Sequence, residues 1–209
     1  MNLEPRGHYP DMVSGELGLL ALGVLAGITN LAGVWSSILE YTSYYPLGSR
    51  DWQFYAFWGT GHLLNLSLLA LGVLQFGTYG LPQLVRGGGF ALVAIGSIIV
   101  FAATRDLGVE QTQGMDEGLR TDGLYRYTRN PQYVGYIPAT AGYALLVDAP
   151  FVFPLCGFYL LWWFSFPLAE EPWLRERYGR EYESYAERVP RFVGRRTLWL
   201  WLGRDYGGK

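Results

Sequence analysis

Two short stretches of this chain gather residue types that could do chemistry. The first, GLYRYTRNPQYVGY at 123–136, places tyrosines and arginines around an Asn-Pro pair at the start of an apolar run. The second places two adjacent carboxylates, Glu170 and Glu171, at the end of another apolar run. Aromatic faces attract cations, and carboxylates accept hydrogen bonds from hydroxyl and ammonium groups. Together these residues could form the wall of a site for a polar ligand.

Both stretches also have a purely structural interpretation. Asn130 and Pro131 would begin a helix, because Asn is a common N-cap and Pro needs no backbone donor in the first turn. The tyrosines and arginines beside them would then lie at a membrane surface, where both residue types are common. The two glutamates would stabilise the start of a following helix through its dipole. The residue types alone leave the two interpretations open.

The distribution of charge predicts a polytopic membrane protein. Half of the residues are hydrophobic and only 16% are charged, whereas about 25% is usual for a soluble domain. A helix needs roughly 20 apolar residues to cross a bilayer. Five stretches without Asp, Glu, Lys or Arg approach or exceed that length, at 17–39, 52–85, 87–104, 130–147 and 149–169. We therefore predict an all-α fold with five transmembrane helices.

The last two of these helices should form a tight antiparallel hairpin, because only the residues around Asp148 separate them. The start of the fourth helix and the end of the fifth would then lie on the same side of the membrane, with Asn130 near Glu170. Two adjacent carboxylates at the end of a membrane helix are costly unless a polar or cationic group meets them. We therefore predict a shared pocket at the open end of the hairpin.

The basic residues predict how the chain is oriented. Thirteen of its sixteen Lys and Arg residues lie from Arg105 onward. The positive-inside rule therefore places the connection at 105–129 and the C-terminal tail on the cytoplasmic side. The predicted pocket would face the cytoplasm, and three preceding crossings would leave the N-terminus outside.

The polar tail predicts one further helix. From Trp173 to Val189, apolar and aromatic residues recur at steps of three or four, with arginines and glutamates on the opposite face. Because Pro172 disfavours a helical conformation at Glu171, we predict that the fifth membrane helix ends there and an amphipathic interfacial helix begins. This divides the chain into membrane helices at 1–104, a cofactor-binding region at 105–194 and a tail at 195–209.

The composition argues against several other kinds of protein. A net charge of −2 and a pI near 5.7 do not favour a nucleic-acid partner. The two histidines, His8 and His62, and the single Cys156 form no group with metal-ligand spacing. We expect no metal site, and one cysteine allows no internal disulfide framework.

Both stretches resemble one family of membrane enzymes. GLYRYTRNPQYVG is similar to the G-x-Y-x-x-x-R-(H/N)-P-x-Y-x-G motif of the isoprenylcysteine carboxyl methyltransferases and phospholipid N-methyltransferases. EEPWLRERYGREYESYAERVPRF resembles the EE-x-x-L…(F/Y)-G-x-E-Y-x-x-Y…V-P ending of the same group. The resemblance covers residues 105–192. It implies an integral-membrane enzyme that transfers a methyl group from S-adenosylmethionine to a lipophilic small molecule or a lipid.

The resemblance also implies roles for individual residues. Cofactor contacts are expected before the first motif, within it and at the glutamate pair, namely at Glu117, Gly118, Leu119, Arg120, Tyr125, Asn130, Pro131, Gln132, Tyr133, Glu170 and Glu171. One of the two glutamates would hold the polar end of the cofactor. In-line displacement depends mainly on orientation, and Tyr133 and Arg129 are the nearest polar candidates for a catalytic role.

The sequence departs from the prenylcysteine enzymes at two points. Asn130 stands where those enzymes have a histidine, and an amide cannot act as a base near neutral pH. The stretch before Glu170, WWFSFPLAEE, lacks the arginine that would suit a substrate carboxylate, so we expect a less charged acceptor. Two other functions stay open. One is a nicotinamide-dependent sterol-type reductase, whose C-terminal pattern is similar, and the other is a non-catalytic membrane protein.

Overall fold

The computed structural model describes residues 9–108, 112, 118–195, 197–198 and 202. This part of the chain contains no strand, which confirms the all-α prediction. Its helices are α1 (Tyr9–Ile38), α2 (Trp52–Leu74), α3 (Gln83–Leu107), the short 3-10 helix η1 (Gly123–Arg126), α5 (Pro131–Val147), α6 (Val152–Tyr178) and α7 (Arg180–Arg188).

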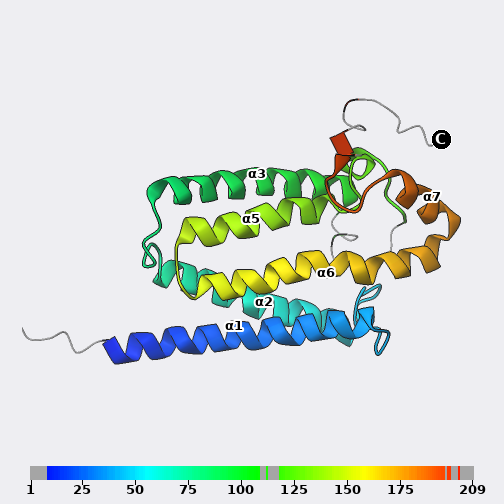
Figure 1. Cartoon of the computed structure of the whole chain (residues 1–209). Helices are drawn as coiled ribbons and strands as arrows, with labels where there is room; N and C mark the ends of the chain where they lie inside the picture. The colour runs from blue at the N-terminus through cyan, green and yellow to red at the C-terminus, as the bar shows by residue number, and fades with distance from the viewer. Residues whose placement is uncertain (1–8, 109–111, 113–117, 196, 199–201, 203–209) are drawn as a thin grey trace, which may run out of the picture.

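The long helices lie alongside one another in two layers (Figure 1). One layer consists of α3 and α5, and the other consists of α1, α2 and α6, with α5 packed against α6. The chain reverses direction at each connection. The connection at 39–51 and the described residues 118–130 therefore lie at the same end of the bundle as α7 and the end of α6 (Figure 1).

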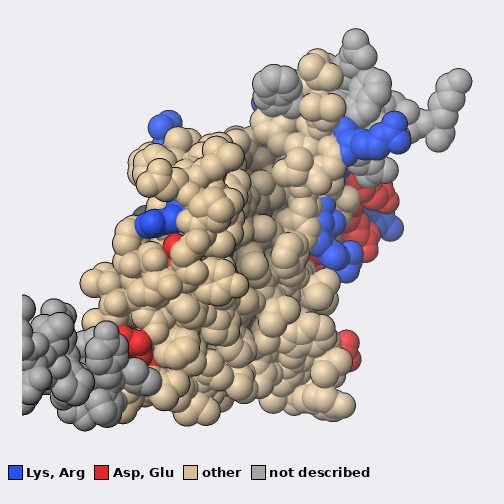
Figure 2. Space-filling model, turned by 60° about the vertical axis from the view of Figure 1, so that its left-hand side comes forward, with Lys and Arg blue, Asp and Glu red and all other residues tan. Residues whose placement is uncertain are grey.

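Among the described residues, four helices are long and apolar enough to cross a membrane, at 14–38, 52–74, 83–107 and 152–178. On the face shown in Figure 2, charged side chains gather mostly near the two ends of the bundle. Helix α5 has 17 residues, fewer than the roughly 20 that usually cross a bilayer. Four of the five predicted crossings therefore coincide with helices that could span a membrane, while the fifth crossing and the transmembrane hairpin stay predictions.

Glycines bring α3 and α5 into direct backbone contact. A Cβ atom at Gly96 of α3 would lie 2.5 Å from the carbonyl oxygen of Gly135 in α5. About two helical turns away, a Cβ atom at Gly142 would lie 2.6 Å from the carbonyl oxygen of Gly89. Small residues allow membrane helices to approach this closely. The interface fixes the start of α5, and hence the Asn-Pro stretch, beside the end of α3.

The predicted helix boundary at Pro172 is wrong. Helix α6 continues through Pro167 and Pro172, and the break falls at Gly179, whose φ is 51°. Proline removes one backbone donor, a loss that membrane helices tolerate, whereas a positive φ ends the helix and suits glycine. The amphipathic helix is therefore the nine-residue α7. Because Glu170 and Glu171 lie within one continuous helix, their side chains leave it in directions about 100° apart.

Asp148 organises the opposite end of the bundle. This residue has a φ of 58° and is 1% exposed in the turn between α5 and α6. Its carboxylate accepts hydrogen bonds from the backbone N–H groups of Gly80 and Leu81 at 3.2 and 3.0 Å. These bonds tie the turn to the connection between α2 and α3.

Candidate functional site

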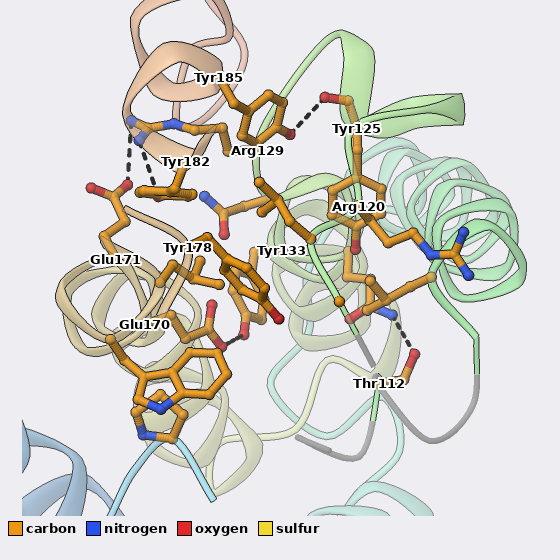
Figure 3. Close-up of a pocket in the computed structure, with 18 residues that line it drawn as sticks. Thr112, Arg120, Tyr125, Arg129, Tyr133, Glu170, Glu171, Tyr178, Tyr182 and Tyr185 are labelled. Carbon is orange, nitrogen blue, oxygen red and sulfur yellow. Dashed lines mark hydrogen bonds and ion pairs between the residues drawn. The ribbon is translucent and has the colours of Figure 1, made fainter. Parts of the chain in front are cut away.

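A cavity whose lining includes charged and polar side chains lies at the end of the bundle where η1 and α7 are found (Figure 3). We call it the polar cavity. It brings together ten of the residues predicted to act at a site, although they come from separate parts of the sequence. They are Gly118, Leu119, Arg120, Tyr125, Arg129, Asn130, Gln132, Tyr133, Glu170 and Glu171.

Two predicted residues are not found in this wall. Pro131 is fully buried and does not line the polar cavity. Glu117 lies outside the described residues. The individual roles expected for the other ten residues stay predictions, but all ten residues line the same cavity.

Glu170 accepts hydrogen bonds from two phenols. The hydroxyl of Tyr133 donates to its Oε1 atom at 2.5 Å, and the hydroxyl of Tyr45 donates to the same atom. Burial, and then the charge of Glu170, raise the pKa of Tyr45 well above its usual range, so its hydroxyl stays protonated. In the described part of the chain, no cation pairs with Glu170 and its Oε2 atom has no donor.

Glu171 takes part in a different network. The guanidinium of Arg191 donates to both of its oxygens at 2.6 and 2.7 Å. Arg129 and Arg175 lie 3.3 and 3.6 Å away. Figure 3 shows Glu171 directed toward Arg129 and Tyr182, while Glu170 is directed toward Tyr133. Since Glu171 is only 3% exposed, these arginines compensate its charge within the protein.

The Asn130 side chain does not cap α5, although the helix begins where the sequence predicts. Its Nδ2 atom instead donates to the carbonyl oxygen of Arg191 at 2.9 Å. The same carbonyl accepts from the hydroxyl of Thr128 at 3.0 Å, and the Arg129 N–H donates to the carbonyl of Pro190 at 2.9 Å. The backbone carbonyls of the segment after α7 therefore accept the hydrogen bonds of the Asn-Pro stretch and hold that stretch in place.

Helix α7 contributes two tyrosines to the polar cavity. The hydroxyl of Tyr182 accepts from Arg129 at 3.2 Å, and the hydroxyl of Tyr185 donates to the carbonyl oxygen of Tyr125 at 2.7 Å. Burial raises the pKa of both tyrosines, so both hydroxyls stay neutral. The apolar face of this short helix thus closes one side of the cavity.

A second cavity adjoins the polar cavity, between α2, α5 and α6. We call it the aromatic cavity, because half of its described lining residues are aromatic. These are Tyr45, Phe57, Trp58, Tyr133, Tyr136, Tyr143, Tyr159, Trp162, Trp163 and Phe166. Thr112, Gln132 and Tyr133 line both cavities. A hydrogen bond of 2.8 Å from the Gln132 amide to the Thr112 hydroxyl joins two parts of this shared wall.

Sequence reasoning missed several residues of the site. Tyr45 and Pro46 come from the connection between α1 and α2, which carries no motif. Arg191, the closest ion-pair partner of Glu171, follows the tail motif directly. The Val-Pro pair marks the end of the tail motif and so points to this region. The role of Arg191, however, depends on a contact with α6, which the periodicity of the sequence cannot reveal.

Comparison with known proteins agrees with the motifs. Residues 85–181 match the family model described as phospholipid methyltransferase. The chain is 37% identical over 84 residues to the protein-S-isoprenylcysteine O-methyltransferase of Schizosaccharomyces pombe. It is 32% identical over 110 residues to the probable protein-S-isoprenylcysteine O-methyltransferases of two rice subspecies, Oryza sativa subsp. indica and japonica. Over this region the chain is similar to the isoprenylcysteine and phospholipid methyltransferases, as the two motifs predict.

The similarity to these methyltransferases is confined to part of each protein. The match covers 39% of this chain and 35% of the S. pombe relative, and 48% of this chain and 56% of each rice relative. No solved structure matches the chain. The family match contains α3, η1, α5 and α6, whereas Tyr45 and Arg191 lie outside it.

Proposed function

We propose that the chain is a membrane-embedded methyltransferase that uses S-adenosylmethionine and acts on a lipophilic acceptor. The observation that carries the proposal is the pair of adjoining cavities. One is lined in part by charged side chains and holds a carboxylate without a cationic partner among the described residues, and the other has aromatic walls. A charged cofactor and an apolar acceptor would each find a suitable surface on either side of the shared wall.

The residues of the polar cavity fit this cofactor. Bound S-adenosylmethionine supplies a methyl group activated on a positively charged sulfonium. The Oε2 atom of Glu170 is suited to accept from an ammonium group or from ribose hydroxyls. The faces of Tyr125 and Tyr178, which line the same cavity, are suited to a sulfonium through cation–π attraction. Arg120, which is exposed at the rim, is suited to a carboxylate.

Tyr133 is the proposed residue closest to the reaction, because it lines both cavities and donates to Glu170. It would orient the carboxylate and exclude water between the two binding surfaces. We propose that Arg129 acts one step away by holding Glu171 and Tyr182. Orientation of this kind is the main contribution that a protein makes to an in-line displacement.

We also propose that α5 crosses the membrane with α6 as a hairpin and that the polar cavity faces the cytoplasm. The density of basic residues after Arg105 supports this orientation. Within the division at 1–104, 105–194 and 195–209, the central region would carry the cofactor site. The hydrogen bond from Tyr45 to Glu170 supports a contribution from the first region as well.

The test is to incubate membranes containing the protein with S-adenosylmethionine labelled on its methyl group, and to identify the labelled product. The proposal predicts label in a lipid-extractable molecule. Membranes that contain a Tyr133→Phe variant at the same level should incorporate less. If wild-type membranes label no more than membranes lacking the protein, across a total lipid extract, the proposed activity is wrong.

A further inference from the structure

The aromatic cavity has the size and the walls of a small-molecule site. Its volume is about 410 Å³, within the range of about 300–1,000 Å³ typical of ligand pockets. Trp162, Phe57 and Phe166 form an aromatic cluster, with the Trp162 ring centroid 6.4 Å from that of Phe57 and 6.1 Å from that of Phe166. None of the described residues that line the cavity is charged. An ionic group placed there would find no charged partner in this wall.

Two donors in this wall lack acceptors. The indole N–H groups of Trp162 and Trp58 are buried and have no hydrogen-bond partner among the described residues. Trp162 is only 3% exposed. Other donors in the same wall are paired: the indole of Trp163 donates to the hydroxyl of Thr140 at 3.0 Å, and Tyr159 donates to Asn65 at 2.6 Å.

Unpaired buried donors point to an absent acceptor. Most buried polar groups in native proteins have a hydrogen-bond partner, and leaving one without a partner is destabilising. Because the neighbouring donors are satisfied, a general lack of acceptors in this part of the fold does not explain the two indoles. An oxygen atom on a molecule within the cavity would supply the missing acceptor.

We propose that the aromatic cavity binds an uncharged, largely apolar molecule carrying a hydrogen-bond-accepting oxygen, and that Trp162 and Trp58 donate to that oxygen. Aromatic walls would stack against its apolar part, while the lack of charge would select against carboxylates and ammonium groups. The step that equates this molecule with the methyl acceptor rests on the proposed function. As a binding site, it is testable without the cofactor.

Two matched probes test the inference in detergent without S-adenosylmethionine. 9,10-Anthraquinone carries two carbonyl oxygens, and anthracene has the same three rings without them. Equilibrium binding of both labelled probes gives a selectivity, the Kd of anthracene divided by that of anthraquinone. Partition of the probes into micelles cancels when this ratio is compared between variants. We expect the selectivity to fall about fivefold or more in Trp162→Phe, which keeps an aromatic ring but removes the donor.

Trp35→Phe is the control, because its indole donates to the Ser165 hydroxyl at 3.1 Å and Trp35 is not among the described lining residues of either cavity; its selectivity should match that of the wild type. The double variant Trp58→Phe/Trp162→Phe should show the largest loss. An unchanged selectivity in both Trp162→Phe and the double variant would overturn the inference. If the variants do not fold, the wild type still decides the matter. The inference is wrong if anthracene or 2-anthracenecarboxylate binds the wild type as tightly as anthraquinone, once each Kd is corrected for the measured partition of that probe into protein-free micelles.

Failure of this inference can be distinguished from failure of the proposed function. Selective probe binding with no cofactor binding would keep the aromatic site and remove the methyltransferase proposal. Cofactor binding without probe selectivity would do the reverse, because the two measurements use different cavities.

Discussion

Glu170 and Glu171 are adjacent in the chain, yet each belongs to a separate network. Glu170 is held by phenols in the wall between the two cavities. Glu171 links α6 to the segment after α7 through Arg191. The first glutamate is therefore placed to meet a ligand, and the second is placed to hold the site together.

Replacing Glu171 should reduce stability more than replacing Glu170 in the same way. Glu171→Gln leaves the mostly buried Arg129 without its anionic partner, which should lower the free energy of unfolding by about 2–3 kcal/mol. Glu170→Gln removes no ion pair among the described residues and should cost less. Thermal unfolding in detergent, followed by circular dichroism, compares the two variants. A larger loss for Glu170→Gln would show that the division of roles is wrong.

Tyr45 should contribute to cofactor binding although it lies outside the family match. Tyr45→Phe removes one of the two donors that orient Glu170, so we expect the affinity for S-adenosylmethionine to fall several-fold, corresponding to about 1 kcal/mol. Tyr44→Phe is the matched control, since the hydroxyl of Tyr44 donates to Asn30 instead. Equal affinities for the two variants in a calorimetric titration would contradict this role.

At the level of elements, the contact between α3 and α5 depends on glycine. A Cβ atom at Gly96 would meet backbone atoms of α5 at 2.5 and 2.7 Å, and backbone atoms cannot rotate away as a side chain can. We expect Gly96→Ala to destabilise the protein by about 1–3 kcal/mol. Gly88→Ala, in the same helix but with nothing near its Cβ position, should be neutral or slightly stabilising. Similar melting temperatures for both variants would exclude the close packing.

The elements could be predicted from sequence where local physics decides them. Stretches without charge located the long helices, and Asn130 with Pro131 located the start of α5. The boundary at Pro172 failed because a proline in a membrane helix is compensated by its surroundings, while Gly179 adopts a positive φ. Because the side-chain directions of the two glutamates depend on one continuous helix, the wrong boundary also prevented a prediction that they point into different networks.

In the molecule as a whole, the connection at 39–51 gathers at one end of the bundle with the described polar segments at 118–129 and 180–195 (Figure 1). The motifs could predict that 123–136 and the glutamate pair share this end. They could not predict Tyr45, which is 125 positions from Glu170, because a contact between distant segments leaves no local pattern. The aromatic cavity could not be predicted either, since most of its lining residues fall in apolar stretches that predict only membrane helices.

The proposed orientation predicts which ends of the bundle are accessible from each side of the membrane. In a Cys156→Ser background, Tyr41→Cys and Arg126→Cys introduce thiols at exposed positions near the polar cavity. Tyr79→Cys introduces one at the opposite end. We expect a membrane-impermeant maleimide to label the first two in inside-out vesicles and the third in right-side-out vesicles. The reverse pattern would place the polar cavity outside.

The central claim is that the polar cavity binds S-adenosylmethionine through Glu170, and calorimetric titration of the purified protein in detergent tests it most directly. Glu176→Ala removes an exposed carboxylate from the same helix and serves as the control for Glu170→Ala. We expect the wild type and Glu176→Ala to bind with equal affinity, and Glu170→Ala to bind about tenfold or more weakly. The claim is contradicted if the wild type does not bind the cofactor, or if all three proteins bind it equally well.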